Sequence, residues 1–356
     1  MLVWFAACIP ENSKGGIARS MRGLSGGLLQ RGHRTKIIFS GSNYLIFTLR
    51  LGIKLLLCAT NPPDWIIARS SDGAFCTVLV KLFRLKTRIA LHNHGWEEIV
   101  TKQEKQLPGK IVLHPTTWKA RAIRLPLLRM TLSLCSCCLS GTLSEVRWLK
   151  NNYPRLEKKM LYVPNGVSIS KENFRFGSNV RPPFFLTVGG HTWKKNLEHA
   201  VNVFKEVSVV TPRARLFMVG TGSISRSLAD IIDGNKSIEV IPEEDPLQMS
   251  KWYEKCPCFI SCSRYEGGHS FAILEAMAHG CVVFTSTIDS TREIITNNEN
   301  GILIGNEISS GAMIVASVLE NNELVAHIRH NAYKAALRNR LDRQVYRLDR
   351  ILCSQL

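Results

Sequence analysis

Short apolar runs alternate with longer amphipathic stretches along the first half of the chain. The longer stretches, 17–31, 73–84 and 144–151, place apolar side chains at helical spacing. The short runs predict buried strands at 2–7, 35–40, 65–68, 88–92, 138–141 and 160–163. Strands that alternate with helices in this way predict a parallel sheet with crossover helices.

The alternation starts again after a polar stretch, which begins with the turn residues Pro164-Asn165-Gly166 and continues as a linker through 168–183. Beyond this linker the pattern predicts strands at 183–188, 214–219, 238–241, 282–285 and 301–304 and helices at 196–210 and 270–279. An Arg-rich helical stretch follows over 320–352.

The repeated pattern predicts an α/β protein with two Rossmann-like, doubly wound domains that face each other across a cleft. We expect these domains at 1–170 and 171–330, followed by a C-terminal helix over 331–356 that could cross back to the first domain. A chain of 356 residues is too long for one ordinary core. Ligands bind doubly wound sheets at the carboxyl ends of their strands, so the cleft is the expected site.

Composition excludes several classes of protein. A hydrophobic content of 45% with 21% charged residues is typical of a globular chain and excludes disorder. The first residues lack the positive charge of a signal peptide, and no stretch reaches the roughly 18 uninterrupted apolar residues of a spanning helix. Eleven cysteines without a secretory signal indicate a reducing compartment, and their spacing does not match a zinc site. We therefore expect free thiols and a cytoplasmic protein.

The net charge of +18 is concentrated in the first half. Residues 1–170 hold 25 Lys and Arg against 8 Asp and Glu, whereas residues 171–356 hold 21 against 20. Such a basic half indicates an anionic partner, either a membrane or nucleic acid. Two apolar segments carry basic residues at helical spacing, which is typical of membrane-surface helices; the alternative is a core helix with a solvated basic edge. The basic residues are Arg50 and Lys54 in 45–59, and Lys119, Arg121, Arg124 and Arg129 in 118–130.

Glycines follow two of the predicted strands. Gly15 and Gly16 open the helix at 17–31, where backbone N–H groups could approach a phosphate. Gly220 and Gly222 follow the strand at 214–219, and this turn could face a nucleotide. Neither site completes the dinucleotide fingerprint G-x-G-x-x-G, which makes a dehydrogenase the weakest interpretation.

The segment 263–280 is the most specific motif in the chain. A glycine-rich loop enters a short apolar helix, so that the N–H groups from Gly268 through His269 and Ser270 to Phe271 would face a diphosphate. Glu275 lies within the apolar run and needs a hydrogen-bonding partner there. A pair of ribose hydroxyls would satisfy it, and a neighbouring loop is the alternative.

Four blocks occur in one order along the chain: GGIARSMRGLSGGLLQRGH at 15–33, PNGV at 164–167, FLTVGGHTWKKNLEHAVNVF at 185–204 leading to LFMVGTG at 216–222, and SRYEGGHSFAILEAMAHG at 263–280. Together they resemble the retaining glycosyltransferases of family four, which have the GT-B fold. The resemblance implies transfer of a sugar from a nucleotide-sugar donor, without a metal or another cofactor.

The resemblance also assigns roles around the donor. Glu275 matches the second Glu of the E-x7-E motif, which binds the ribose. Glu266 is nine positions before it instead of eight, so either the loop holds one extra residue or the role at the sugar has shifted. Lys195 matches the Lys of the phosphate-binding pair. The Arg of that pair is absent at Gly190 and His191, which leaves His191 or Lys194 as a substitute.

In the first domain the family places a His near the donor sugar, and His94 fits this position better than His92. The catalytic candidates are therefore His94, Lys195 and Glu266. In such enzymes the acceptor hydroxyl attacks from the face that the nucleotide leaves, and a diphosphate oxygen takes its proton.

The basic first half suggests an acceptor at a membrane. We expect a peripheral enzyme at the inner face of the membrane that glycosylates a lipid-linked or cell-surface glycan precursor. Two alternatives remain open. A nucleotide-sugar epimerase shares the fold and the diphosphate site but takes no acceptor. A nucleic-acid-binding protein explains the charge but not the glycine loops or Glu275, and the basic segments lack interleaved aromatics, so we expect no nucleic-acid partner.

Overall fold

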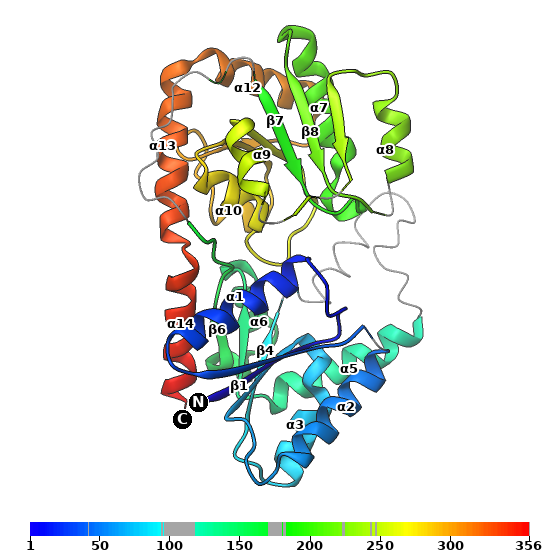
Figure 1. Cartoon of the computed structure of the whole chain (residues 1–356), viewed down its shortest axis with the longest axis vertical. Helices are drawn as coiled ribbons and strands as arrows, with labels where there is room; N and C mark the ends of the chain where they lie inside the picture. The colour runs from blue at the N-terminus through cyan, green and yellow to red at the C-terminus, as the bar shows by residue number, and fades with distance from the viewer. Residues whose placement is uncertain are drawn as a thin grey trace. The chain divides into compact units, whose positions relative to one another are not determined.

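The computed structural model describes residues 1–41, 43–93, 95, 118–169, 180, 183–222, 225–242, 244–245 and 248–355, without the side chains of 118–124. The chain divides into two compact units (Figure 1). The first comprises Met1–Gly166 together with Leu341–Leu356, and the second comprises Val167–Arg340. The division falls four residues before the boundary expected from sequence, and the last helix belongs to the first unit.

The first unit contains a six-stranded parallel sheet of order β2-β1-β3-β4-β5-β6. Its strands are β1 (Leu2–Ala7), β2 (Arg34–Phe39), β3 (Trp65–Arg69), β4 (Arg88–His92), β5 (Cys137–Ser140) and β6 (Met160–Tyr162). Its α-helices are α1 (Gly16–Gln30), α2 (Tyr44–Leu57), α3 (Ala74–Leu82), α5 (Trp118–Leu134), α6 (Leu143–Asn152) and α14 (Leu341–Ser354). Two 3-10 helices, η1 (Ser70–Gly73) and η2 (Pro154–Lys159), complete the described elements of this unit.

Alternate strand residues of the first unit enter two different cores, because successive side chains of a strand point to opposite faces. Val3 and Phe5 pack with α1 and α14, whereas Trp4 and Ala6 pack with α2, α3, α5 and α6. The helix α14 therefore lies on the same face as α1 (Figure 1). A side chain at Gly27 of α1 would come within 2.3 Å of Val345, so glycine permits this close packing.

The second unit has a six-stranded parallel sheet of order β12-β11-β10-β7-β8-β9. Its strands are β7 (Phe184–Val188), β8 (Arg215–Val219), β9 (Ile238–Ile241), β10 (Cys258–Ser261), β11 (Val282–Ser286) and β12 (Ile302–Ile304). Its helices are η3 (Trp193–Lys195), α7 (Leu197–Val210), α8 (Ser225–Ile232), α9 (Met249–Lys255), α10 (Phe271–Ala278), α11 (Asp289–Arg292), α12 (Ile308–Glu320) and α13 (Asn322–Arg338).

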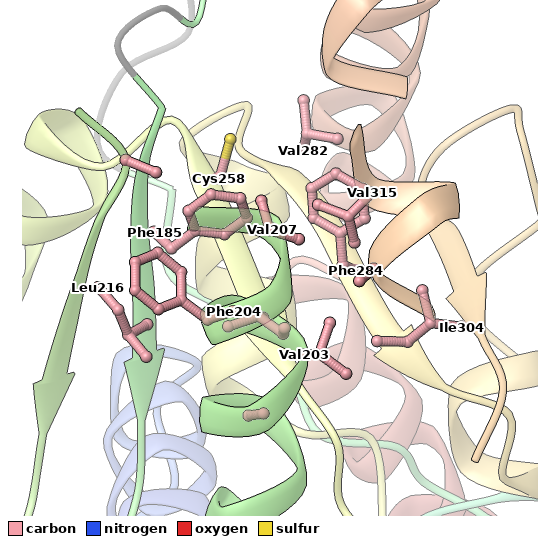
Figure 2. Close-up of a cluster of buried hydrophobic side chains, with 14 of the residues drawn as sticks. Phe185, Val203, Phe204, Val207, Leu216, Cys258, Val282, Phe284, Ile304 and Val315 are labelled. Carbon is pink, nitrogen blue, oxygen red and sulfur yellow. The ribbon is translucent and has the colours of Figure 1, made fainter. Parts of the chain in front are cut away.

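Both faces of this second sheet are covered. On one face Phe185 and Phe284 pack against Phe204 of α7 and Val315 of α12 (Figure 2). The rings of Phe185 and Phe204 meet edge to face with centroids 5.6 Å apart. On the other face, α9, α10 and α13 enclose a second core. A parallel sheet is stable when helices bury both of its faces, as they do here.

The fold class expected from sequence, α/β with two doubly wound sheets, is confirmed. Strand β10 was not predicted, because its run of four residues is too short to be told from any other buried segment. The prediction of a single helical stretch over 320–352 was also wrong. It consists of α13 and α14, and their apolar residues belong to the cores of different units. No helix in the described ranges is long and apolar enough to cross a membrane.

Candidate active site

The central strands of the second sheet define the place where a ligand is expected. From β7 the strand order runs one way to β8 and β9 and the other way to β10, β11 and β12. Ligands bind such sheets at this reversal, just beyond the carboxyl ends of the strands. The loop after β7 contains residues 189–196, and the loop after β10 contains residues 262–270. Both loops carry residues that the sequence identified.

Local backbone geometry directs Lys195 in the first loop. The short helix η3 ends at Lys195, and Asn196 adopts a left-handed conformation (φ 50°) before α7 begins. Gly189 has φ 149°, and a side chain added there would come within 3.3 Å of Cε of Lys195. A glycine at 189 therefore leaves room for the lysine to extend along the loop.

Lys195 and Glu266 form an ion pair that joins the two loops. The Lys195 ammonium donates to Oε1 of Glu266, and Ser263 Oγ donates to the same oxygen at 2.8 Å. The side chains are 20% and 9% exposed, respectively, so the pair is mostly shielded from water. Burial raises the pKa of Glu266, but the charges of Lys195 and Lys194 and the two hydrogen bonds outweigh it and bring the pKa below its ordinary value. Glu266 is therefore ionised at neutral pH.

Arg264 supports the same arrangement and was not identified from the sequence. Its guanidinium donates to the carbonyl of Trp193 at 2.7 Å and lies 4.7 Å from the centre of the Trp193 ring. Its backbone N–H donates to the carbonyl of Lys194 at 2.9 Å. Arg264 thus holds η3 against the loop that carries Glu266. The Lys194 ammonium lies 5.9 Å from the centre of the Tyr265 ring.

The loop after β8 packs directly on the loop after β7. A side chain at Gly220 would come within 2.1 Å of the Gly189 carbonyl oxygen, and one at Gly222 would come within 2.3 Å of the His191 carbonyl oxygen. Gly222 N–H donates to Ser225 Oγ at 3.1 Å, and Ser225 Oγ contacts Nδ1 of His191 at 2.9 Å. These glycines allow backbone-to-backbone contact. Gly190 is exposed beside them.

His191 can offer a neutral hydrogen-bonding group there. Its side chain is 2% exposed, and burial lowers its pKa from the ordinary value. Its Nε2 is buried without a hydrogen-bond partner among the residues that the structure describes. A groove of about 620 Å³ begins at His191, Thr221 and Ser225 and continues along α8. Its apolar wall includes Leu228, Ile232, Val240 and Pro242.

The helix α10 begins where the glycine-rich loop ends. Ser270 is its N-cap residue, with extended backbone and no side-chain capping bond, and Phe271 is its first helical residue. The loop residues Gly267 and Gly268 are partly exposed, whereas His269 is buried and its Nε2 lies 3.3 Å from Oε2 of Glu293. The buried His269 anchors the loop between Glu266 and Glu275, which are nine positions apart in the sequence.

Glu275 is half-buried on α10 and makes a separate set of contacts. Its Oε2 accepts a hydrogen bond from the hydroxyl of Tyr253 at 3.0 Å. The Tyr253 ring stacks on His279, with centroids 5.1 Å apart, and His279 Nδ1 lies 2.8 Å from the Glu275 carbonyl oxygen. Tyr253, on α9, thus helps to orient Glu275. The sequence did not reveal it, because it lies at an ordinary core position.

The first sheet reverses its strand order between β1 and β3, and the glycine candidates of the first unit follow β1. Gly15 and Gly16 are exposed at the N-terminus of α1, and Arg22 holds the preceding loop through the carbonyls of Glu11 and Ser13 at 2.6 Å each. His92 is 1% exposed at the end of β4, and burial lowers its pKa to about 4. His94, the preferred catalytic histidine, lies outside the described residues.

One group of potential metal ligands occurs among the described residues. His33, Asp349 and Cys353 place their ligand atoms within 4.8 Å of one another. However, Asp349 already accepts from Nε of Arg31 at 2.6 Å and contacts Nε2 of His33 at 2.7 Å. Because the positively charged guanidinium of Arg31 already contacts the Asp349 carboxylate, binding of a metal cation there is disfavoured. These contacts are better explained as a connection between the end of α1 and α14.

Comparisons with known proteins concern the family of the second unit and the fold of the chain. Residues 168–335 match the family model described as glycosyl transferases group 1, whereas no curated protein matches the chain. The fold resembles sucrose-phosphate synthase from Thermosynechococcus elongatus (TM-score 0.77, 12% identity, 100% of this chain and 99% of that one). It also resembles HepE from Anabaena in complex with UDP (TM-score 0.73, 14% identity, 99% and 100%).

A third similar structure is longer than this chain. It is a mutant of TarM from S. aureus in complex with Fondaparinux, alpha-GlcNAc-glycerol and UDP (TM-score 0.64, 16% identity). The match covers 84% of this chain but 57% of that one. At these identities the three structures show a shared fold.

Proposed function

We propose that this chain, a glycosyltransferase of the GT-B type by its group 1 domain and its two sheets, transfers a sugar from a nucleoside-diphosphate sugar with retention of anomeric configuration. The observation that carries the proposal is the Lys195–Glu266 pair, which joins two loops at the strand-order reversal. A mostly buried cation at this position is suited to stabilise the negative charge of a leaving diphosphate.

Each residue of this site has a chemical task in the proposed reaction. Lys195 and the N–H groups at the start of α10 stabilise the negative charge that develops on the diphosphate as the glycosidic bond breaks. Glu266 stays ionised, holds Lys195 in place and accepts hydrogen bonds from the sugar hydroxyls. The acceptor hydroxyl attacks from the face that the diphosphate leaves, and a diphosphate oxygen takes its proton. In this scheme the protein residues supply the charge stabilisation, so we propose that no metal is required.

The nucleoside occupies the remaining part of the site in this proposal. Glu275, oriented by Tyr253, binds the ribose hydroxyls. The groove along α8 takes the base, with His191 among its lining residues and Leu228 and Pro242 on its apolar wall. A volume of about 620 Å³ is sufficient for a nucleoside. Because burial keeps His191 neutral, Lys194 is the better substitute for the missing Arg of the phosphate pair.

The test is a set of nucleotide sugars, beginning with UDP-glucose, assayed for thermal stabilisation and for turnover with and without glycan acceptors. A ligand at one hundred times its dissociation constant stabilises a protein by about 2.7 kcal/mol. We expect Lys195→Met to lower turnover by at least a hundredfold, as for loss of one group that stabilises transition-state charge. Lys334→Met, an exposed lysine of α13, is the matched control.

The product's anomeric configuration, measured by NMR, tests retention directly. An inverted product would refute the same-face reaction. Donor conversion without any acceptor would favour the epimerase. Full activity of Lys195→Met would refute the role assigned to Lys195 and its ion pair with Glu266.

We also propose that the first unit docks on an anionic membrane at the cytoplasmic face, where the acceptor is a lipid-linked or cell-surface glycan precursor. The eleven cysteines, all free, fit a reducing compartment. The helix α2 supports docking because its outer surface is apolar. Five large apolar side chains on it are 45–80% exposed: Leu45, Ile46, Leu49, Ile53 and Leu57.

At 100° per residue these five side chains cover an arc of about 120°, and Arg50 and Lys54 lie beside it. The remaining arc, with Phe47 and Leu51, packs on the core. Leu82 and Phe83, next to α2 at the end of α3, are 69% and 55% exposed. Apolar residues bordered by basic ones are typical of a helix that lies in a membrane interface. The side chains of Lys119, Arg121 and Arg124 lie outside the described residues; Arg129 is exposed on α5.

Co-sedimentation with vesicles, with and without phosphatidylglycerol, tests the docking. Leu49 and Ile53 are about half exposed, so burying each in the membrane contributes about 1 kcal/mol. Leu49→Gln with Ile53→Gln should therefore weaken vesicle binding about 30-fold without lowering thermal stability. Val210→Gln with Met313→Gln changes two even more exposed apolar residues of the second unit and should leave binding unchanged. Wild-type protein that stays in the supernatant at low salt would refute docking.

A further inference from the structure

The outer surface of α14 contains an arginine-rich groove that the proposed reaction does not use. The groove has a volume of about 820 Å³. Its walls are formed by the exposed side of α14 together with Arg31 at the end of α1, all within the first unit. Arg343, Arg347 and Arg350 recur at intervals of four and three residues, which places them along one side of the helix. We call this surface the α14 groove.

The charges in the α14 groove are only partly balanced. Arg31 is paired with Asp349, and Asp342 lines the groove near Arg343. Among the described residues, no carboxylate forms an ion pair with Arg343, Arg347 or Arg350. Four arginines against two aspartates leave a net positive charge in a concave surface. Arginine is the side chain best suited to bind phosphate or sulfate, because its planar fork can donate two hydrogen bonds.

Three of the four arginines, Arg31, Arg347 and Arg350, lie against aromatic rings. Arg31 and Arg350 lie 5.1 and 6.0 Å from the centre of the Tyr346 ring, and Arg347 lies 5.0 Å from the centre of the Tyr162 ring. These contacts limit the freedom of long side chains, so less entropy is lost when they bind a ligand. They also occupy Tyr346, the one aromatic residue that lines the groove. A nucleic-acid base would need such a ring for stacking.

The position of the groove disfavours a membrane as its partner. The helix α14 covers the face of the first sheet opposite to α2, because the two helices enter different cores. A bilayer that contacts the apolar arc of α2 cannot at the same time contact α14. In addition, Tyr346 is the only large apolar side chain of α14 among those more than a third exposed in the described ranges. A membrane-inserting helix needs several.

We propose that the α14 groove binds a soluble polyanionic glycan, a sugar chain that carries phosphate or sulfate groups. Along α14 the arginines are separated by about 6 Å for four residues and about 4.5 Å for three, at 1.5 Å per residue. Charged groups that repeat along a flexible chain can therefore contact several arginines at once. The proposal goes beyond the transferase reaction and does not depend on it, since binding is measured without donor.

The experiment is fluorescence anisotropy of the full chain with labelled probes. The probes are a heparin-type sulfated oligosaccharide, inorganic polyphosphate, single-stranded oligothymidine and neutral dextran. The test variant is Arg343→Gln with Arg350→Gln. The matched control is Arg155→Gln with Lys158→Gln, which removes the same charge from exposed positions of η2 outside the groove. Circular dichroism and thermal unfolding establish that both variants are folded.

We expect wild type to bind the sulfated and phosphorylated chains and not dextran. The groove variant should bind these chains about 30-fold more weakly, from about fivefold for each arginine beside an anionic partner. The slope of log affinity against log salt should also fall by about 1.5, because two cations no longer release counterions. The control should retain the wild-type slope.

Three results would overturn the proposal. Equal losses in the groove and control variants would show that net charge alone causes binding. Tighter binding of oligothymidine than of the sulfated oligosaccharide and polyphosphate would identify a nucleic-acid site. Loss of binding to phosphatidylglycerol vesicles in the groove variant, with polyanion binding unchanged, would assign the groove to lipid headgroups.

Discussion

The hydrogen bond from Tyr253 to Glu275 gives a quantitative test of the candidate donor site. Tyr253→Phe removes one hydroxyl and keeps the ring that stacks on His279. Tyr253 is 2% exposed, so water does not replace the lost partner from its side. A hydrogen bond to a charged group contributes about 1.5–3 kcal/mol, and the half-buried Glu275 recovers part of this from solvent. We therefore expect a loss of about 1–2 kcal/mol in the free energy of unfolding.

For a unit of this size, 1 kcal/mol corresponds to about 2–4 °C in melting temperature. Calorimetry should show a lower melting temperature in Tyr253→Phe, in Glu275→Gln and in the double variant. The losses should not add: the double variant should be more stable than the sum of the two single losses predicts, by about 1 kcal/mol, because Glu275→Gln already weakens the charge-assisted hydrogen bond that Tyr253→Phe removes. Tyr44→Phe is the control, since it removes a 2.8 Å hydrogen bond to the Ser71 carbonyl in the other unit and should add to Glu275→Gln without coupling.

Isothermal titration with UDP extends the cycle to function. Glu275→Ala should weaken nucleotide binding more than Glu275→Gln does, because only the latter keeps hydrogen bonds to ribose. Tyr253→Phe should have an intermediate effect, since it frees Glu275 from its fixed orientation. A coupling energy below about 0.5 kcal/mol between Tyr253 and Glu275 would refute the orienting role. Unchanged UDP affinity in Glu275→Ala would refute the ribose assignment.

Three further predictions concern individual titrating groups. Glu266→Gln should lower turnover by about tenfold or more, equivalent to about 1.4 kcal/mol, as measured in steady-state assays with donor and acceptor; a silent variant would mean that other groups hold the sugar. Because burial lowers the pKa of His92 from 6.5 to about 4, the unfolded chain binds more protons between these values. The contribution of His92 to the free energy of unfolding should thus be constant above about pH 6.5 and fall by up to about 1.4 kcal/mol per pH unit toward pH 4, as measured in urea titrations. His92→Asn should reduce this slope. Burial raises the pKa of Cys135, Cys256 and Cys262 to about 12, so these thiols should resist Ellman's reagent at pH 8 until the chain unfolds. Burial and the hydrogen bond to Asp349 also raise the pKa of Cys353, but this thiol is exposed and should react slowly in the native state.

The sequence by itself determined the secondary structure that alternating and helical patterns encode. Most of the predicted strands and helices lie within one or two residues of those observed, because buried parallel strands and amphipathic helices have distinct periods. It also singled out Glu275 as a candidate, since a carboxylate within an apolar run needs a special partner. Lys195 and Glu266 became candidates through the resemblance of their motifs to family four. The same reasoning missed β10, whose short run resembles any buried segment, and it joined α13 to α14, because a helical period does not reveal which core a helix enters.

Only the tertiary structure decided which side chains meet. Lys195 and Glu266 are 71 residues apart, and their pairing depends on β7 and β10 being neighbours in the sheet. Tyr253 and Ser225 occupy positions that no pattern distinguishes, and within the segment 263–280 nothing singles out Arg264. Each of these residues nevertheless contacts a loop or side chain of the candidate site. The arginines of α14 form a groove because the opposite side of the helix is buried against α1. Periodicity along a chain reports local geometry and burial, whereas the partner of a side chain depends on strand order and on which sheet face a helix covers.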